Sequence, residues 1–342
     1  DYPDIIVGRL SAQSSADVDT QVERIIEYET MPAANQSWFW QGIGIASDDG
    51  SGNGDDSEWD WEHIRNIRTD LINYGYTAVD ELYEGSQGGA DAAGNPTDTM
   101  VTTLVDAGRG IINYCGHGGT THWSTTGFNN ADVNALTNDN MLPFIFDVAC
   151  LNGNFGETTC FAEAWMRATN GSEPTGAIGI YASSINQPWS PPMEAQDEFN
   201  MLYVAESYKS YGAYCYAAAC SMMDDYPGNG ETYGNGHATF NTWHIFGDPT
   251  LRITGEDLPD KQLRYTPVTP CRIVDTRISQ GGSGPIPGGT KNSYYAAGLC
   301  GVAFGPAKAV MINITAVNPT GTGHLRAFPY PKPKPFAATL SS

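Results

Sequence analysis

Two apolar runs that each end at a reactive side chain constrain the fold of this chain more than any other feature. The first, "GIINYCGHGG" (110–119), stops at His117, and the second, "LPFIFDVAC" (142–150), stops at Cys150. Each run has the length of a buried strand and is bounded by Gly, Asn or Pro. The stretch between them, "NNADVNALTND" (129–139), has the pattern of a short helix. Strand, helix and strand together predict a βαβ unit, whose two strands are parallel and close neighbours.

The βαβ unit places the two reactive side chains near each other. The carboxyl ends of parallel strands meet at one edge of a sheet, where open α/β folds have their ligand crevices. His117 and Cys150 come directly after those ends. Alone, the histidine could be a turn residue and the cysteine a buried structural thiol. Together they predict a nucleophilic thiol with an imidazole as its base.

The rest of the chain indicates two domains. Up to about residue 255, strands alternate with helices, which predicts an α/β fold with a mostly parallel sheet; helices are expected at 14–30, 61–74, 97–108 and 194–208. From 256 onward a polar linker and short β-type runs separated by Gly and Pro predict a small β-sandwich module. Its two cysteines, Cys271 and Cys300, are expected to form a disulfide. The opening "DYPDIIVGRLSA" reads as a strand already under way, so we expect the first domain to be N-terminally incomplete.

Charge and cysteine usage restrict the partners and the compartment. The 342 residues include 39 Asp and Glu against 17 Lys and Arg, a net charge of −22. Such a surface repels nucleic acid and anionic membranes and favours cations or basic peptides. No apolar run approaches the length of a membrane span. The seven cysteines form no CxxC pair, and the low lysine content is typical of an extracellular protein.

Five separated motifs carry a resemblance to a known family. In order they are "NYCGHGGTTHW", "LPFIFDVACLNGNF", "CFAEAWMRA", "SSINQPWSPPMEAQDEFN" and "TWHIFGDPTL". Over about residues 1–255 the chain resembles the gingipain family of caspase-like cysteine peptidases, with the nearest likeness to its lysine-specific branch. The resemblance implies a caspase-like α/β/α sandwich and a protein that is extracellular or on the surface of a bacterium. It also implies that His117 is the general base, that Cys150 is the nucleophile, and that the N–H groups of Cys150 and Gly118 stabilise the oxyanion.

An acidic loop, "SDDGSGNGDDSEWD" (47–60), is expected to supply the residue that orients the histidine. Alignment with the family selects Asp55 for this role, with Asp48 as its rival. The loop can also be read as a solvated turn or as a calcium site, because carboxylates, Asn53 and backbone carbonyls are oxygen ligands. The resemblance implies structural calcium, with ligands that the sequence does not identify, and no cofactor for catalysis.

The substrate pocket is predicted from two further residues. Trp189 matches a tryptophan that lines the primary pocket in the family, and Asp197 or Glu194 would supply a negative charge for a basic side chain. The expected function is therefore endopeptidase cleavage after a basic residue, lysine before arginine, in protein or peptide substrates. An adhesive surface protein on a retained peptidase scaffold and a transpeptidase remain alternatives. The C-terminal module resembles a β-domain of bacterial secreted and surface proteins, and we expect it to attach the protein to a surface or to assemble with other copies.

Overall fold

The computed structural model describes residues 3, 5–31, 36–50, 55–156, 159–228 and 234–253, and short stretches between 269 and 341. The chain divides into two compact units, Asp1–Asp257 and Leu258–Ser342. In the second unit the short strands β12 (His324–Leu325) and β13 (Leu340–Ser341) pair antiparallel. The expected disulfide between Cys271 and Cys300 is confirmed. Most of the predicted β-sandwich lies outside the described residues.

The first unit is built on one seven-stranded sheet in the order β1-β11-β10-β7-β4-β2-β3. Its strands are β1 (Gly8–Arg9), β2 (Gln41–Ala46), β3 (Ala78–Tyr83), β4 (Ile111–Cys115), β7 (Phe144–Val148), β10 (Gly179–Ser183) and β11 (Trp243–Gly247). The five from β3 to β10 are parallel, β11 is antiparallel to β10, and β1 is parallel to β11. The predicted βαβ unit is confirmed, because β4 and β7 are parallel neighbours with Cys115 opposite Val148.

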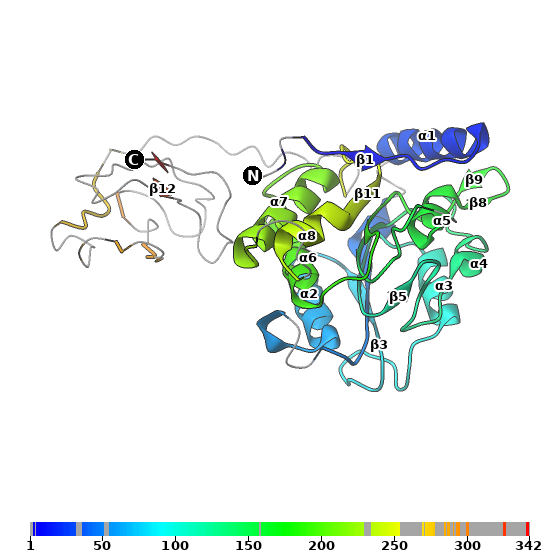
Figure 1. The fold of residues 1–342 in the computed structure, drawn as a ribbon, viewed down its shortest axis with the longest axis horizontal. Coiled ribbons are helices and arrows are strands. Elements are labelled where there is room, and N and C mark those ends of the chain that lie inside the picture. The colour runs from blue at the N-terminus through cyan, green and yellow to red at the C-terminus, as the bar shows by residue number, and fades with distance from the viewer. Residues whose placement is uncertain are drawn as a thin grey trace. The chain divides into compact units, whose positions relative to one another are not determined.

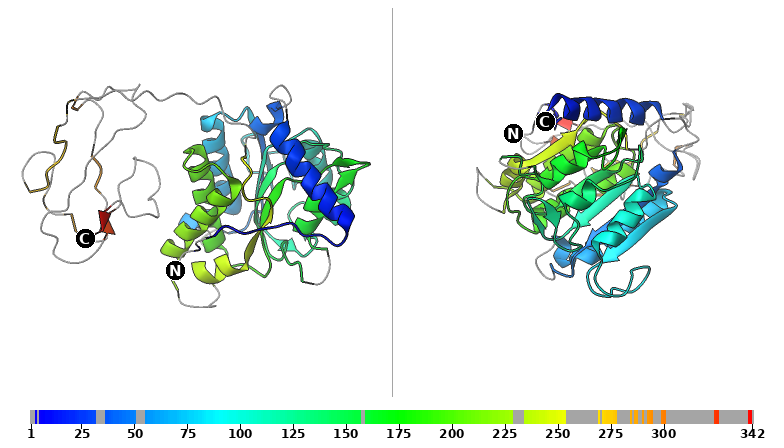
Figure 2. Two further views of the ribbon diagram at one scale, coloured as in Figure 1. Left: turned by 90° about the horizontal axis from the view of Figure 1, so that it is seen from above. Right: turned by 90° about the vertical axis from the view of Figure 1, so that its right-hand side faces the viewer.

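Helices cover both faces of this sheet (Figures 1 and 2). One face carries α2 (Asp60–Tyr74), α6 (Ser190–Val204), α7 (Tyr211–Asp225) and α8 (Gly236–Thr242). The other face carries α1 (Ser15–Thr30), α3 (Asp98–Asp106), α4 (Asn130–Val133) and α5 (Phe161–Arg167). The result is the α/β/α sandwich expected from the sequence. No helix in the described part of the chain is both long and apolar enough to cross a membrane.

Alternation along the strands explains why both faces are covered. On β7, Ile145 belongs to the core cluster that includes residues of α3, α4 and α5. Its neighbours point the other way: Phe144 packs on Tyr211 of α7, and Phe146 packs on Phe199 of α6. A strand that is buried on both sides reads as a continuous apolar run, because neither of its faces meets water.

Several elements differ from the sequence-based expectation. The helix expected at 194 begins at Ser190, because two prolines occupy its first turn, where a missing N–H costs nothing. The run "WFWQGIGIAS" (38–47) predicts a strand over its whole length, but the strand begins at Gln41, after a 3₁₀ turn, η2 (Ser37–Trp40). Helix α7 was not predicted, because buried residues surround its axis and leave no polar stripe to mark a helical period.

Candidate active site

The loops that carry His117 and Cys150 are in contact at the carboxyl edge of the sheet. Gly116 N donates to Val148 O at 3.1 Å, which continues the pairing of β4 with β7 beyond the strand ends. Gly118 lies directly against the cysteine loop: a Cβ atom at this position would come within 2.9 Å of both Cys150 O and Ala149 Cβ. Glycine is therefore required for the approach of the two loops. The loops that carry His117 and Cys150 are therefore neighbours, as the predicted βαβ unit requires.

Two residues that the sequence analysis did not single out fix these loops. The buried Asn152 donates through Nδ2 to Gly119 O at 2.6 Å and to His122 O at 3.0 Å. It thereby holds the turn between β5 (Gly118–Gly119) and β6 (His122–Trp123) against the segment after Cys150. The backbone N–H of Gln187 donates to Cys150 Sγ at 3.3 Å. This contact fixes the sulfur against the segment that leads to Trp189.

The carboxylate that contacts the imidazole belongs to Asp49. Its Oδ2 lies 3.0 Å from His117 Nε2, and the two side chains are about half exposed, at 51% and 54%. Asp49 was not among the candidates. Asp55 instead begins a short 3₁₀ turn, η3 (Asp55–Ser57), and accepts a hydrogen bond from Tyr226 Oη at 2.7 Å. The structure therefore brings neither Asp55 nor its rival Asp48 into hydrogen-bond contact with His117 among the described residues.

Trp189 connects the histidine to a buried acid. Its ring meets the His117 ring edge to face, with centroids 5.2 Å apart, and its Nε1 donates to Asp60 Oδ1 at 2.7 Å. The other oxygen of Asp60 accepts from the Ser47 hydroxyl. Burial raises the pKa of Asp60 to about 6, and the hydrogen bonds from Ser47 and Trp189 oppose this shift. Trp189 therefore contacts both His117 and Asp60, and its role as a wall of the substrate pocket stays a prediction.

Gly50 lies directly against Asp60 and Trp189. Gly50 has φ +94°, a conformation that residues with a Cβ rarely adopt. A Cβ there would lie 2.6 Å from Asp60 Oδ1 and 2.9 Å from Trp189 Nε1. Any other residue at position 50 would therefore press on the acid and the indole.

The two acids proposed for the substrate pocket have other contacts. Asp197 lies 3.4 Å from His63 Nδ1 on α2. Burial and the neighbouring Asp55 raise the pKa of Glu194 to about 9. The structure thus associates Trp189 with Asp60 rather than with Asp197. Sequence reasoning missed Asp60 because it is one of several carboxylates in the same loop, and composition does not indicate which of them is buried.

In the described part of the acidic loop, two of the carboxylates have other partners. Asp49 and Asp55 are engaged by His117 and Tyr226, and Asn53 lies outside the described residues. Among the residues that the structure describes, one group of three could hold a metal ion: Glu58, His63 and Asp197. Calcium prefers oxygen ligands, so this histidine-containing group does not suit it. The calcium site stays a prediction.

A thiol and an imidazole that follow adjacent parallel strands, with a carboxylate on the imidazole, form an arrangement in which a base can activate a nucleophile. Residues 1–254 match the profile of Peptidase family C25, and the chain belongs to this family.

Individual relatives and a solved structure agree with membership of this family. The chain is 36% identical to gingipain R1 of Porphyromonas gingivalis over 284 residues, which cover 81% of this chain and 27% of that protein. Lys-gingipain HG66 of the same species is 22% identical over 340 residues, covering 93% of this chain and 18% of that protein. The crystal structure of the Arg-specific cysteine proteinase gingipain R matches with a TM-score of 0.67 and 36% identity, covering 73% of this chain and 56% of that one.

Two facts follow from these matches. The chain spans about a quarter of the length of gingipain R1. The likeness to Lys-gingipain is weaker than the likeness to gingipain R1, so the expected nearness to the lysine-specific branch was wrong.

Proposed function

We propose that this chain carries an endopeptidase that hydrolyses the bond after a basic residue. The observation that carries the proposal is the pair of contacts made by Trp189. Its ring meets the His117 ring edge to face, and its Nε1 donates a hydrogen bond to Asp60. The indole offers an apolar wall to an aliphatic stem, and the carboxylate offers a partner to the charge at its end. A buried carboxylate whose negative charge is not compensated by a cation costs free energy even when it accepts hydrogen bonds, so the pocket selects for a cation.

The proposed chemistry uses the residues of the two loops. His117 takes the proton of Cys150, and the thiolate attacks the carbonyl carbon of the substrate. Asp49, bonded to Nε2, orients the ring and leaves Nδ1 to exchange the proton. The N–H groups of Gly118 and Cys150 are proposed to stabilise the oxyanion. The protonated His117 then gives its proton to the leaving amine, and water hydrolyses the acyl-enzyme.

We propose that arginine is preferred over lysine. The lysine preference came from the motifs, whereas the larger identity is with gingipain R1, and the matched solved structure is named as Arg-specific. A single carboxylate can pair with either cation, so Asp60 alone does not separate them.

The remaining proposals concern the setting of the enzyme. Secretion to the medium or to the bacterial surface is supported by the Cys271–Cys300 disulfide, because such bonds persist in oxidising compartments. We propose that the C-terminal unit attaches the enzyme to a surface or to other copies of the chain. Structural calcium is also retained as a proposal, motivated by the net charge of −22.

The test is a panel of fluorogenic peptides that differ only in the residue before the cleaved bond. We expect cleavage after Arg and Lys, with Arg faster, and loss of nearly all activity in Cys150→Ala and in His117→Ala, since members of a catalytic unit act together. Equal rates for basic and neutral residues would reject the acidic pocket. A correctly folded chain that neither cleaves nor reacts with a basic acyloxymethyl ketone would support the adhesive alternative. Dominant transfer to an added amine would support a transpeptidase.

A further inference from the structure

A second histidine, His63, is buried in a polar network away from the dyad. It lies in the first turns of α2, and its side chain is fully buried. Its Nε2 lies 3.0 Å from Gln196 Oε1 on α6. The Gln196 amide nitrogen donates to three oxygens: Asn113 Oδ1 at 3.2 Å, Tyr114 O at 3.3 Å and Phe146 O at 3.2 Å. These acceptors fix the orientation of the amide, so its oxygen must accept from the imidazole. His63 Nε2 therefore carries a hydrogen.

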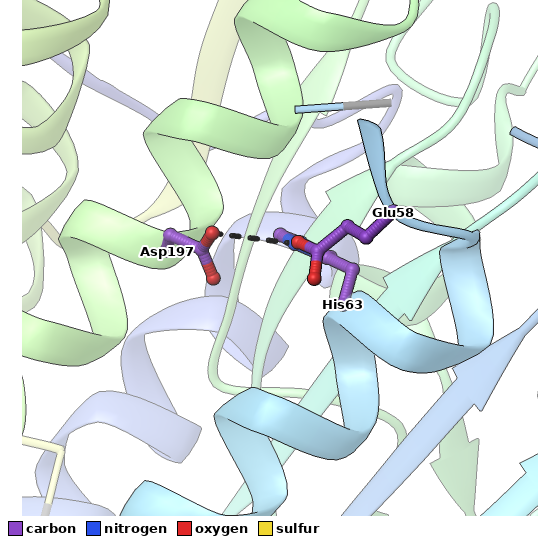
Figure 3. Close-up of side chains that lie close together, drawn as sticks. All are labelled: Glu58, His63 and Asp197. Atoms are coloured by element: carbon purple, nitrogen blue, oxygen red, sulfur yellow. Dashed lines mark hydrogen bonds and ion pairs between the residues drawn. The ribbon is translucent and has the colours of Figure 1, made fainter. Parts of the chain in front are cut away.

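The other ring nitrogen faces two carboxylates (Figure 3). His63 Nδ1 lies 3.0 Å from Glu58 Oε1 and 3.4 Å from Asp197 Oδ2, and the three atoms lie within 4.8 Å of one another. Glu58 comes from the loop before α2, and Asp197 comes from α6. Two carboxylate oxygens and one nitrogen thus converge on a small space. Its occupant must be positive: either a second proton on the ring or a metal ion.

We propose that Glu58, His63 and Asp197 bind a divalent transition-metal ion, zinc before the others. In a tetrahedral site with bonds of about 2.0–2.1 Å, ligand atoms lie about 3.3 Å apart. The distances from His63 Nδ1 to Glu58 Oε1 and Asp197 Oδ2, 3.0 and 3.4 Å, fit that geometry. A water molecule would complete the coordination, since the Glu58 and Asp197 side chains are 15% and 30% exposed.

The surrounding hydrogen bonds match those of a metal site, and the charge balance favours a metal over a proton. Ligating histidines usually donate their other N–H to an oxygen, as His63 does to Gln196, and ligating carboxylates are themselves hydrogen-bonded. Asn66 Nδ2 donates to the second oxygen of Glu58 at 2.9 Å. A proton on the ring compensates one of the two negative charges, whereas a divalent ion compensates both. The nitrogen ligand separates this site from the proposed calcium site.

The ion would join two elements that carry the proposed substrate pocket. Helix α2 begins at Asp60, and α6 begins immediately after Trp189. A metal that binds both helices would hold the acid and the indole in place without touching the substrate. The role is structural, and it does not depend on the reaction that the dyad performs.

The site is tested by zinc titration of a catalytically silent protein. Cys150→Ala removes the thiol that would compete for the ion. After dialysis against a chelator, zinc chloride is titrated in a calorimeter. We expect one equivalent per chain and at least tenfold weaker binding in Asp197→Asn and in Glu58→Gln, each made in the same background. Glu62→Gln is the matched control on α2: it removes one charge, retains an acceptor for Trp59 N, and should leave the affinity unchanged.

Folding is checked on every variant by circular dichroism, and a crystal of the unsubstituted chain grown with zinc gives a readout that needs no variant. An anomalous peak within bonding distance of His63 Nδ1 would support the site. Absence of that peak, or zinc affinity that is unchanged by both Asp197→Asn and Glu58→Gln, would show that His63 is a protonated ring with two ion-pair partners. None of these measurements reads out catalysis, so their failure would leave the proposed peptidase function standing.

Discussion

Replacing Asp60 by asparagine isolates the contribution of one charge to substrate selection. The side chain is fully buried and accepts from Trp189 Nε1 at 2.7 Å and from the Ser47 hydroxyl. Asparagine has the same shape: its oxygen still accepts from the indole, and its amide can donate to Ser47 Oγ. The cost of burying an ionised group, which raises the pKa of Asp60 to about 6, also disappears. We therefore expect Asp60→Asn to fold normally.

The expected loss is worked from the interaction that the charge makes. A hydrogen bond to a charged group contributes about 1.5–3 kcal/mol, and a buried charge left without its partner costs about 3–5 kcal/mol. We take about 3 kcal/mol for a cationic substrate bound beside Trp189. Because about 1.4 kcal/mol corresponds to a factor of ten, kcat/KM should fall about a hundredfold.

The assay compares two peptides that differ only in having arginine or norleucine before the cleaved bond. The ratio of their kcat/KM values should collapse about a hundredfold in Asp60→Asn, while the norleucine peptide is cleaved at nearly the original rate. Glu194→Gln, at one of the acids proposed from the sequence, should change the ratio by less than about twofold. A preserved ratio in Asp60→Asn, or a collapse in Glu194→Gln, would refute the assignment of Asp60 as the pocket acid.

Three further predictions concern the base, the core and bound ions. Asp49→Asn should slow the arginine and norleucine peptides alike, by about tenfold in kcat given its half-exposed contact with His117, and the ratio of their kcat/KM values should not move. Burial raises the pKa of Asp147 to about 8, above its unfolded value. The folded state therefore binds the extra proton between about pH 4 and 8, and stability should fall as pH rises through this window. Asp147→Asn should flatten that dependence, as measured by urea unfolding at pH 5 and pH 8; an equal slope in both proteins would contradict it. Removal of calcium by EGTA should lower the melting temperature, and an unchanged temperature would count against a structural calcium ion.

The sequence predicted the site residues whose positions follow from the order of the strands. It missed the residues whose roles depend on the direction of their side chains. His117 and Cys150 followed from two strands whose order and parallel pairing the apolar runs specify. The sequence identified the acidic loop, but it does not show which carboxylate in that loop has which partner, because the carboxylates are chemically alike. The partners of Asp49 and Asp60 depend on how the loop turns after β2, which brings the Asp60 N–H to Asp49 O at 3.0 Å. That backbone contact has no signature in the spacing of residues.

The order of strands explains why these loops converge. Strands β2, β4, β7 and β10 are consecutive in the sheet and parallel, so the segments after them leave from one edge. Those segments carry Asp49, His117, Cys150 and Trp189, in the same order as the strands. The base therefore lies between its orienting acid and its nucleophile. Strand β11 is antiparallel to β10, so the chain leaves it at the opposite edge, and the acidic residue that follows it, Asp248, is excluded from the site by topology alone.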